Sequence, residues 1–145
     1  MKKAFTMIEL IFVIIVLGIL AGIAVSRYLP LITSAHMSNI KNFVRTLNSS
    51  VGEQLWGWSL RNDKNGDISY LGNIDQWIKP IKEINGTSIN VSNCNDPTQY
   101  KTIAETKSEY TNGITYYIQC KDGTATSAPY FRLINQDGKI IYERN

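Results

Sequence analysis

Residues 5–25 read FTMIELIFVIIVLGILAGIAV, an apolar run that contains one charged residue, Glu9. As a helix this run would be about 31 Å long, close to the ~30 Å thickness of the hydrocarbon layer of a bilayer. A carboxylate inside a membrane segment costs roughly 2.5–3.5 kcal/mol and usually has a partner. We expect no residue between Phe5 and Val25 to supply that partner, which leaves the chain terminus, another molecule or the membrane interface.

The first interpretation of this run is a plain membrane anchor. Lys2 and Lys3 precede it, and Arg27 is the one charge just after it. Because cytoplasmic flanks are enriched in Lys and Arg, this pattern predicts a cytoplasmic N-terminus with the rest of the chain outside.

The second interpretation is a conventional secretory signal. Lys2 and Lys3 would form its basic region, Leu10–Leu20 its apolar core and Gly22-Ile23-Ala24 its small-residue cleavage motif, so that the mature chain begins at Val25. The protein would then be a secreted or singly anchored binding module. This interpretation gives Glu9 no role.

The third interpretation starts from Met-Lys-Lys-Ala followed by Phe5-Thr6-Met7-Ile8-Glu9-Leu10. This segment resembles the prepilin signature of type IV pilins and type II secretion pseudopilins, although Ala4 stands where the family usually has Gly. In that family a membrane peptidase removes the leader and the new N-terminal residue is N-methylated. The resemblance implies cleavage between Ala4 and Phe5, N-methylation of Phe5, and a match of Glu9 to the family's glutamate at the fifth mature position.

The physics of the segment agrees with this resemblance. Cleavage before Phe5 would create an amine that is positively charged at neutral pH. Pairing that amine with Glu9, within one helix or between staggered subunits, would neutralise two groups that are each unfavourable in lipid. Phe5 and Glu9 are therefore our predicted assembly residues. Gly18 and Gly22 form a small-xxx-small face that would allow close helix packing, or they are ordinary membrane-helix composition.

The resemblance implies a structural subunit and no enzyme activity. Its implied partners are other pilin-like subunits, in homo- or hetero-oligomers, the prepilin peptidase, an inner-membrane assembly platform and cytoplasmic membrane lipid. The implied location is the cytoplasmic membrane with the head in the periplasm, followed by a periplasmic or extracellular filament (a pseudopilus or fimbrium). The sequence does not separate pseudopilin from pilin, major from minor subunit, or one cargo from another.

Helical periodicity continues beyond the membrane run. An apolar stripe recurs at steps of three and four residues: Ile40, Phe43, Val44, Leu47, Val51, Leu55 and Trp58. We expect Pro30 to kink or interrupt the helix and the helix to end near Leu60–Asn62. The predicted organisation is a leader at 1–4, a transmembrane and assembly helix at 5–27, an amphipathic continuation at 28–62 and a β-rich head at 63–145.

The head reads as a small antiparallel sheet of three or four strands. Residues 114–120, 130–134 and 140–142 are rich in β-formers, and Asp137-Gly138 marks a turn before the last of them. Residues 73–82 suggest a short helix cut by Pro80, and 99–112 receive no assignment. The predicted fold class is α+β and pilin-like, with the long helix packed on the sheet.

Cys94 and Cys120 are the two cysteines of the chain. An even number in a chain with an export signal favours a disulfide, and the alternative is two unrelated buried thiols. His36 is a lone histidine without an evident nucleophile partner, so catalysis has little support.

Three further motifs have simpler explanations. Residues 63–67 (DKNGD) resemble the start of a calcium loop, but the glycine is misplaced and a turn is favoured; we predict no cofactor, with calcium unsupported. Asn85-Gly86-Thr87 is a glycosylation sequon or simply an Asn-Gly turn. Trp56, Trp58 and Trp77, with the eight tyrosines, would form a surface aromatic patch for DNA or another substrate, or they fill a small core or a subunit contact. Without Lys2 and Lys3 the net charge of +3 falls to +1, so direct nucleic-acid binding is disfavoured.

Overall fold

The computed structural model describes residues 5–144, so the leader at 1–4, including Ala4 on one side of the expected cleavage, lies outside the described residues. The chain divides into two compact units, Met1–Ala35 and His36–Asn145. Each unit is described by itself below.

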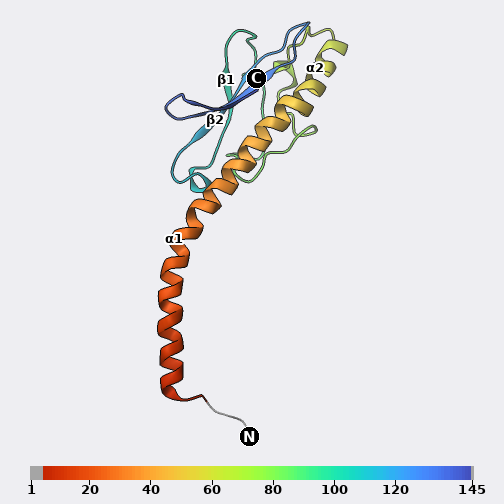
Figure 1. Cartoon of the computed structure of the whole chain (residues 1–145). Helices are drawn as coiled ribbons and strands as arrows, with labels where there is room; N and C mark the ends of the chain where they lie inside the picture. The colour runs from red at the N-terminus through yellow and green to blue at the C-terminus, as the bar shows by residue number, and fades with distance from the viewer. Residues whose placement is uncertain (1–4, 145) are drawn as a thin grey trace. The chain divides into compact units, whose positions relative to one another are not determined.

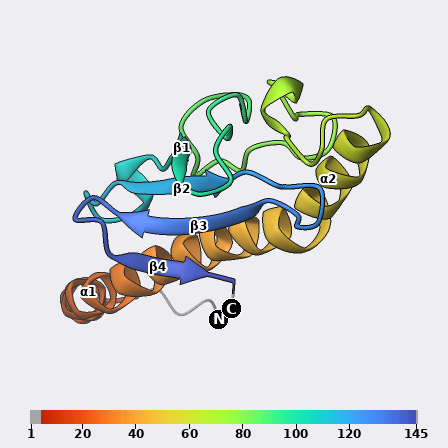
Figure 2. The same cartoon turned by 90° about the horizontal axis from the view of Figure 1, so that it is seen from above.

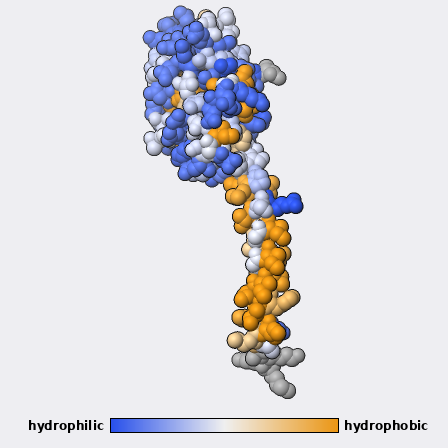
Figure 3. Space-filling model, turned by 90° about the vertical axis from the view of Figure 1, so that its left-hand side faces the viewer, coloured by the Kyte–Doolittle hydropathy of each residue, from blue (hydrophilic) through white to orange (hydrophobic). Residues whose placement is uncertain are grey.

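The first unit is helical. Helix α1 spans Met7–Thr46 (Figure 1). Up to Ala35 almost all its apolar side chains are exposed (Figure 3). By length and composition this helix could cross a membrane. Of the kink or interruption expected at Pro30, the interruption is wrong, because α1 continues through that residue. The fixed φ of proline fits a helix. Pro30 has no N–H, so one helical hydrogen bond is missing, but the hydrogen bonds of the neighbouring turns hold the helix together.

The second unit begins with the rest of α1, which leads into a π-helical turn at Leu47–Val51 and then α2 at Gly52–Arg61. The end of α2 confirms the predicted helix end near Leu60–Asn62. The predicted stripe is buried from Ile40 to Leu55, while Trp58 retains 42% exposure. The stripe therefore packs inside the unit, except at its last position.

Four antiparallel strands form one sheet in the order β1-β2-β3-β4: β1 Lys101–Glu105, β2 Tyr116–Lys121, β3 Tyr130–Asn135 and β4 Ile140–Glu143. Three of them overlap the strands expected from the sequence, and the turn before β4 has Gly138 at φ +80°. Strand β1 lies in the stretch that the sequence left unassigned. The α+β prediction, with a helix against a small antiparallel sheet, is confirmed.

The core lies between the helix and one face of the sheet (Figure 2). The helix contributes Ile40, Phe43, Val44, Leu47, Val51 and Leu55, and the sheet contributes Ile118, Cys120, Phe131 and Leu133. A polar contact crosses this apolar layer. The side-chain amide of Asn48 donates to the carbonyl of Phe131 (2.7 Å) and its oxygen accepts the Phe131 N–H (2.9 Å). The helix is thereby fixed to β3 by a two-bond pair.

The expected helix at 73–82 is wrong. The structure holds a single turn there, in which the Ile78 N–H donates to the Ile74 carbonyl at 3.1 Å. That turn does not propagate, because Pro80 has no N–H to donate and disfavours a helical conformation before it. Short 3-10 turns occur instead at Ser69–Leu71 and Ser108–Tyr110.

Cys94 and Cys120 form a disulfide, as predicted. Both are fully buried, and the bond ties the loop before β1 to β2. It closes a sequence separation of 26 residues, which by chain entropy alone stabilises a fold by about 3.5 kcal/mol.

Candidate functional site

Glu9 lies in the first turn of α1, and its carboxylate is bonded to Thr6. Glu9 Oε2 accepts the backbone N–H of Thr6 at 2.9 Å and the Thr6 hydroxyl at 3.0 Å. In return the Thr6 hydroxyl oxygen accepts the Glu9 N–H at 3.4 Å. This reciprocal arrangement is a capping box, in which a threonine before the helix and a glutamate three residues later satisfy each other's polar groups.

Thr6 therefore corrects our expectation that nothing between Phe5 and Val25 would supply a partner for Glu9. The expectation considered charges and overlooked neutral donors. The signal was present in the sequence, because a Thr followed by Glu at the third position just before an apolar run is the capping-box pattern. Thr6 is a functional candidate that the sequence reasoning missed.

Apolar side chains surround the Glu9 carboxylate. Phe5, Ile8, Phe12 and Val13 line an open depression of about 380 Å³ beside it. Gly18 and Gly22, further along the same helix, have no atom outside their local helix backbone within 4 Å of where a Cβ would stand. The predicted assembly residues thus lie on an apolar surface that no described part of the chain covers.

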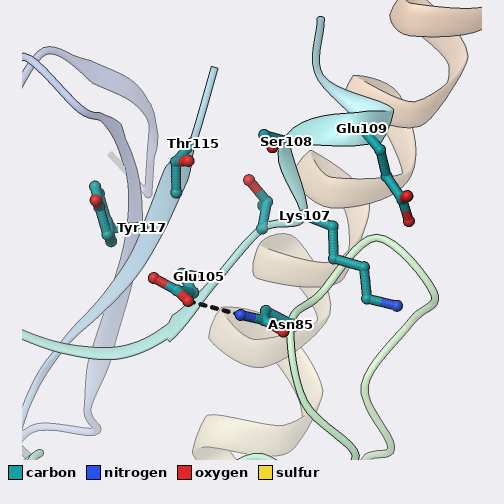
Figure 4. A pocket seen from close by; sticks show the side chains of 8 residues that line it. Asn85, Glu105, Lys107, Ser108, Glu109, Thr115 and Tyr117 are labelled. Atoms are coloured by element: carbon teal, nitrogen blue, oxygen red, sulfur yellow. Dashed lines mark hydrogen bonds between the residues drawn. The ribbon is translucent and has the colours of Figure 1, made fainter. Parts of the chain in front are cut away.

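A second concave site lies on the head between the loop at Asn85 and the strands β1 and β2 (Figure 4). It is open, holds about 410 Å³ and has a polar lining. The Asn85 side-chain amide donates to Glu105 Oε1 at 2.7 Å, and its backbone N–H donates to the Glu105 carbonyl at 2.8 Å. Asn85 stands in the expected turn, with Gly86 at φ +103°. Glu83, the acidic residue of the sequon, is only 1% exposed.

Glu83 is held by a buried polar network that the sequence did not reveal. Its Oε1 accepts hydrogen bonds from His36 Nδ1 (2.7 Å) and from Asn39 Nδ2 (3.0 Å). Burial raises the pKa of the Glu83 carboxyl, but the hydrogen bonds from Asn39 and His36 outweigh it and leave the pKa below its usual value. His36 also packs against the ring of Tyr110, with 4.8 Å between centroids. The lone histidine is thus a structural partner of a buried carboxylate.

The segment 63–67 forms a turn, as favoured from the sequence, with Asp63, Asn65 and Gly66 at positive φ. Within residues 5–144 no group of three or more His, Cys, Asp or Glu side chains is placed to hold a metal ion. Asp67 and Asp122 do face each other. Burial and the neighbouring Asp67 raise the pKa of Asp122 to about 6, against the lowering effect of two backbone N–H donors.

The three tryptophans do not form one patch. Trp56 is partly buried and donates from Nε1 to the Thr124 carbonyl at 2.7 Å. Trp58 and Trp77 make an edge-to-face pair with 6.2 Å between ring centroids, and Arg61 lies over Trp58. This arrangement is a packed pair beside the end of α2.

No protein-family model, no curated protein and no solved structure matches the chain.

Proposed function

We propose that this protein is a membrane-anchored structural subunit of a pilin-like filament, processed before Phe5 and assembled through its N-terminal helix. The pilus or pseudopilus would be extended by adding subunits from the cytoplasmic membrane, and its partners would be like subunits, a prepilin peptidase and an assembly platform. The head would lie in the periplasm before assembly.

One observation carries the proposal: the sole carboxylate of an exposed apolar helix lies in the first helical turn, beside the expected new N-terminus. A simple anchor gains nothing from such a group, which is unfavourable in lipid. A subunit that must pair with its neighbours gains a specific register from it. The prepilin-like motif at residues 1–10 supports the same conclusion.

The capping box adds a step to this assembly. While the subunit is alone in the membrane, the two Thr6 donors solvate the Glu9 carboxylate. The Thr6 donors are neutral, whereas a protonated amine from a neighbouring Phe5 would add Coulombic attraction in a medium of low dielectric constant, so it would compete well for that carboxylate. Thr6 would act as a positioning residue that aims the carboxylate until the amine arrives.

Sequencing the mature N-terminus tests the processing step directly. We expect N-methylated Phe5. A mature chain that begins at Val25 would instead assign the N-terminal segment to a removed signal peptide and refute the proposal.

Substitution of Glu9 tests the assembly step. Glu9→Ala should still insert in the membrane, since removing a charge favours insertion, but it should be poorly incorporated into filaments. Glu9→Gln keeps the size and the Thr6 contacts without the charge, and should fail in the same way. Glu109→Ala, which removes an exposed carboxylate of the head, is the matched control. Normal incorporation of both Glu9 variants would contradict the pairing mechanism.

A further inference from the structure

Three asparagines of the chain are followed, two positions later, by a serine or threonine, the pattern that N-glycosylation requires: Asn48, Asn85 and Asn90. Asn48 is 2% exposed, and its amide nitrogen donates to two backbone carbonyls, which uses both of its hydrogens. Asn85 and Asn90 are exposed. Some bacterial glycosylation systems also require an acidic residue two positions before the asparagine, and of the three only Asn85 has one, Glu83. Asn85 is therefore the acceptor that meets every requirement.

The side-chain amide of Asn85 is placed so that it can carry a substituent. It lies at the start of an exposed turn, residues 85–88, in which Gly86 has φ +103°. One amide hydrogen is donated to Glu105 Oε1 at 2.7 Å, and within residues 5–144 the second hydrogen makes no hydrogen bond. N-glycosylation replaces one of the two hydrogens of an asparagine amide, so the other can keep the bond to Glu105.

The same amide lines the open hollow of about 410 Å³ on the head (Figure 4). Glu105 and Tyr117 are directly paired in the register of β1 and β2, so their side chains lie on one face of the sheet. Together with the Thr115 hydroxyl and the Lys107 ammonium, they give the hollow hydrogen-bond donors, acceptors and both signs of charge. A neutral ligand covered with hydroxyl groups can use such a mixed lining. A saccharide has this chemistry.

We propose that Asn85 is an N-glycosylation site and that the first saccharide units lie in this hollow, against Glu105, Thr115 and Tyr117. In the transfer, Asn85 Nδ2 forms a bond to C1 of a saccharide carried on a lipid diphosphate. The bond from C1 to the diphosphate oxygen breaks, the lipid diphosphate leaves, and Nδ2 loses one hydrogen as a proton. The site requires only that the head is exported, which its disulfide favours, and it is independent of filament assembly.

The burial of Glu83 sets the order of modification and folding. This residue is 1% exposed, and its Oε1 accepts hydrogen bonds from His36 and Asn39 of α1. An enzyme that reads the Glu83 carboxylate therefore cannot reach it in the folded head. The saccharide is attached while residues 83–87 are still unfolded, and it reaches the hollow when this segment packs against α1 and β1.

Mass spectrometry of the full-length protein purified from the cells that produce it tests the site. The tryptic peptide 83–101 contains both Asn85 and Asn90, and fragmentation should place a saccharide on Asn85. Asn85→Gln and Thr87→Ala should each give the bare peptide, and Thr87→Ser should keep the addition. Asn90→Gln, which removes the exposed acceptor that lacks the acid, is the matched control and should stay modified. A bare wild-type peptide, or a saccharide on Asn90 in place of Asn85, would overturn the proposal. N-terminal processing is read from a different peptide, so its failure is distinguishable.

Substitutions at two positions test the order of events. Glu83→Gln should abolish the addition and Glu83→Asp should keep it. His36→Ala disturbs the same buried contact but leaves the acid in place, so it should remain modified. Because the saccharide is attached before folding, a folding defect alone does not remove it. A saccharide that persists in Glu83→Gln would contradict the role given to this residue.

Thermal unfolding tests the place of the saccharide. Protein made in cells without N-glycosylation has the same sequence and no saccharide, and both forms can be compared in the same neutral detergent. The glycosylated form should melt about 4–8 °C higher, the shift expected for one net hydrogen bond in a domain of this size. Replacing both hydroxyls, in Thr115→Val/Tyr117→Phe, should reduce this difference by at least half without changing the saccharide mass. Equal melting temperatures of the two wild-type forms would refute the placement in the hollow.

Discussion

The contact between His36 and Glu83 makes a quantitative prediction about the stability of the head. Glu83 is 1% exposed, and His36 and Asn39 both donate hydrogen bonds to its Oε1. A hydrogen bond to a charged group contributes about 1.5–3 kcal/mol, and more is lost when the buried charge is left without that donor. The imidazole retains 15% exposure, so water can partly replace it. We therefore expect His36→Ala to lower the free energy of unfolding by about 3 kcal/mol at pH 7.

A double-mutant cycle isolates the charge from ordinary packing. In the background of Glu83→Gln no buried charge is left behind, and His36→Ala should cost only about 1 kcal/mol, the value of a neutral hydrogen bond. The coupling between the two positions should then be about 2 kcal/mol. Ser38→Ala, an exposed substitution on the same helix, is the control and should change stability by less than about 0.5 kcal/mol.

The assay is urea unfolding of the full-length protein in neutral detergent, with tryptophan fluorescence as the signal. Hydrogen exchange of the Lys107 amide gives a local measure, because that N–H donates to the Glu83 carbonyl at 2.8 Å. Its exchange should accelerate in His36→Ala and not in Ser38→Ala. Equal losses from His36→Ala in both backgrounds would refute the argument that the buried charge is what His36 compensates.

The pH dependence has a definite sign. The pKa of Glu83 is lowered in the folded state by its hydrogen bonds from Asn39 and His36, which exceed the effect of burial. Its contribution is therefore present above the unfolded pKa of about 4.5 and is lost as the pH falls through the lower, folded value. The fluorescence-monitored stability of wild type should drop in this acid range more steeply than that of Glu83→Gln.

Three other predictions concern single positions. Because the pKa of Asp122 is raised to about 6, wild type should gain stability as the pH falls from 7 to 5, by about 1.3 kcal/mol; Asp122→Asn should abolish this gain in urea titrations at several pH values. Asn48→Ala leaves both backbone groups of Phe131 without their side-chain partner and should cost about 2–4 kcal/mol by the same assay; a loss below about 1 kcal/mol would show that water replaces the amide. Gly66 has φ +93°, and the Cβ added by Gly66→Ala would overlap the backbone of the loop after β2, so this substitution should prevent proper folding of the region around Gly66 and that loop. Gly86 has φ +103° but space around it, so Gly86→Ala should lower stability by only about 1–2 kcal/mol in thermal unfolding.

The helical half of the fold was predictable because its pattern is local. The apolar stripe from Ile40 to Leu55 repeats with the helical period, and it is buried as expected. Strand β1 was not predictable in the same way. It is an edge strand with the sequence KTIAE, and edge strands carry polar and charged residues that dilute the alternation on which strand prediction depends.

The residues of the candidate site also divide into those that a local sequence pattern indicates and those that only the tertiary fold brings together. Glu9 stood out because a charge inside an apolar run is a local anomaly. Thr6 lies three residues before Glu9, so the capping-box pattern could have identified it from the sequence. His36 and Glu83 are 47 residues apart, and Glu83 lies in a loop without periodicity. Only the tertiary fold brings them together, so no pattern along the chain indicates the pair.

The π-helical turn at Leu47–Val51 determines how the protein tolerates changes in chain length. Asn48 lies in this turn, and its two hydrogen bonds to the Phe131 backbone fix the rotation of the helix relative to β3. If one residue were deleted just before this turn, every preceding helical position would rotate by about 100° relative to Asn48 and the sheet. Ile40 and Val44 would leave the core and polar neighbours would enter it. Natural variants of this chain should therefore keep the spacing from residue 40 to 48 fixed, while insertions collect in loops such as the one at Asp137-Gly138.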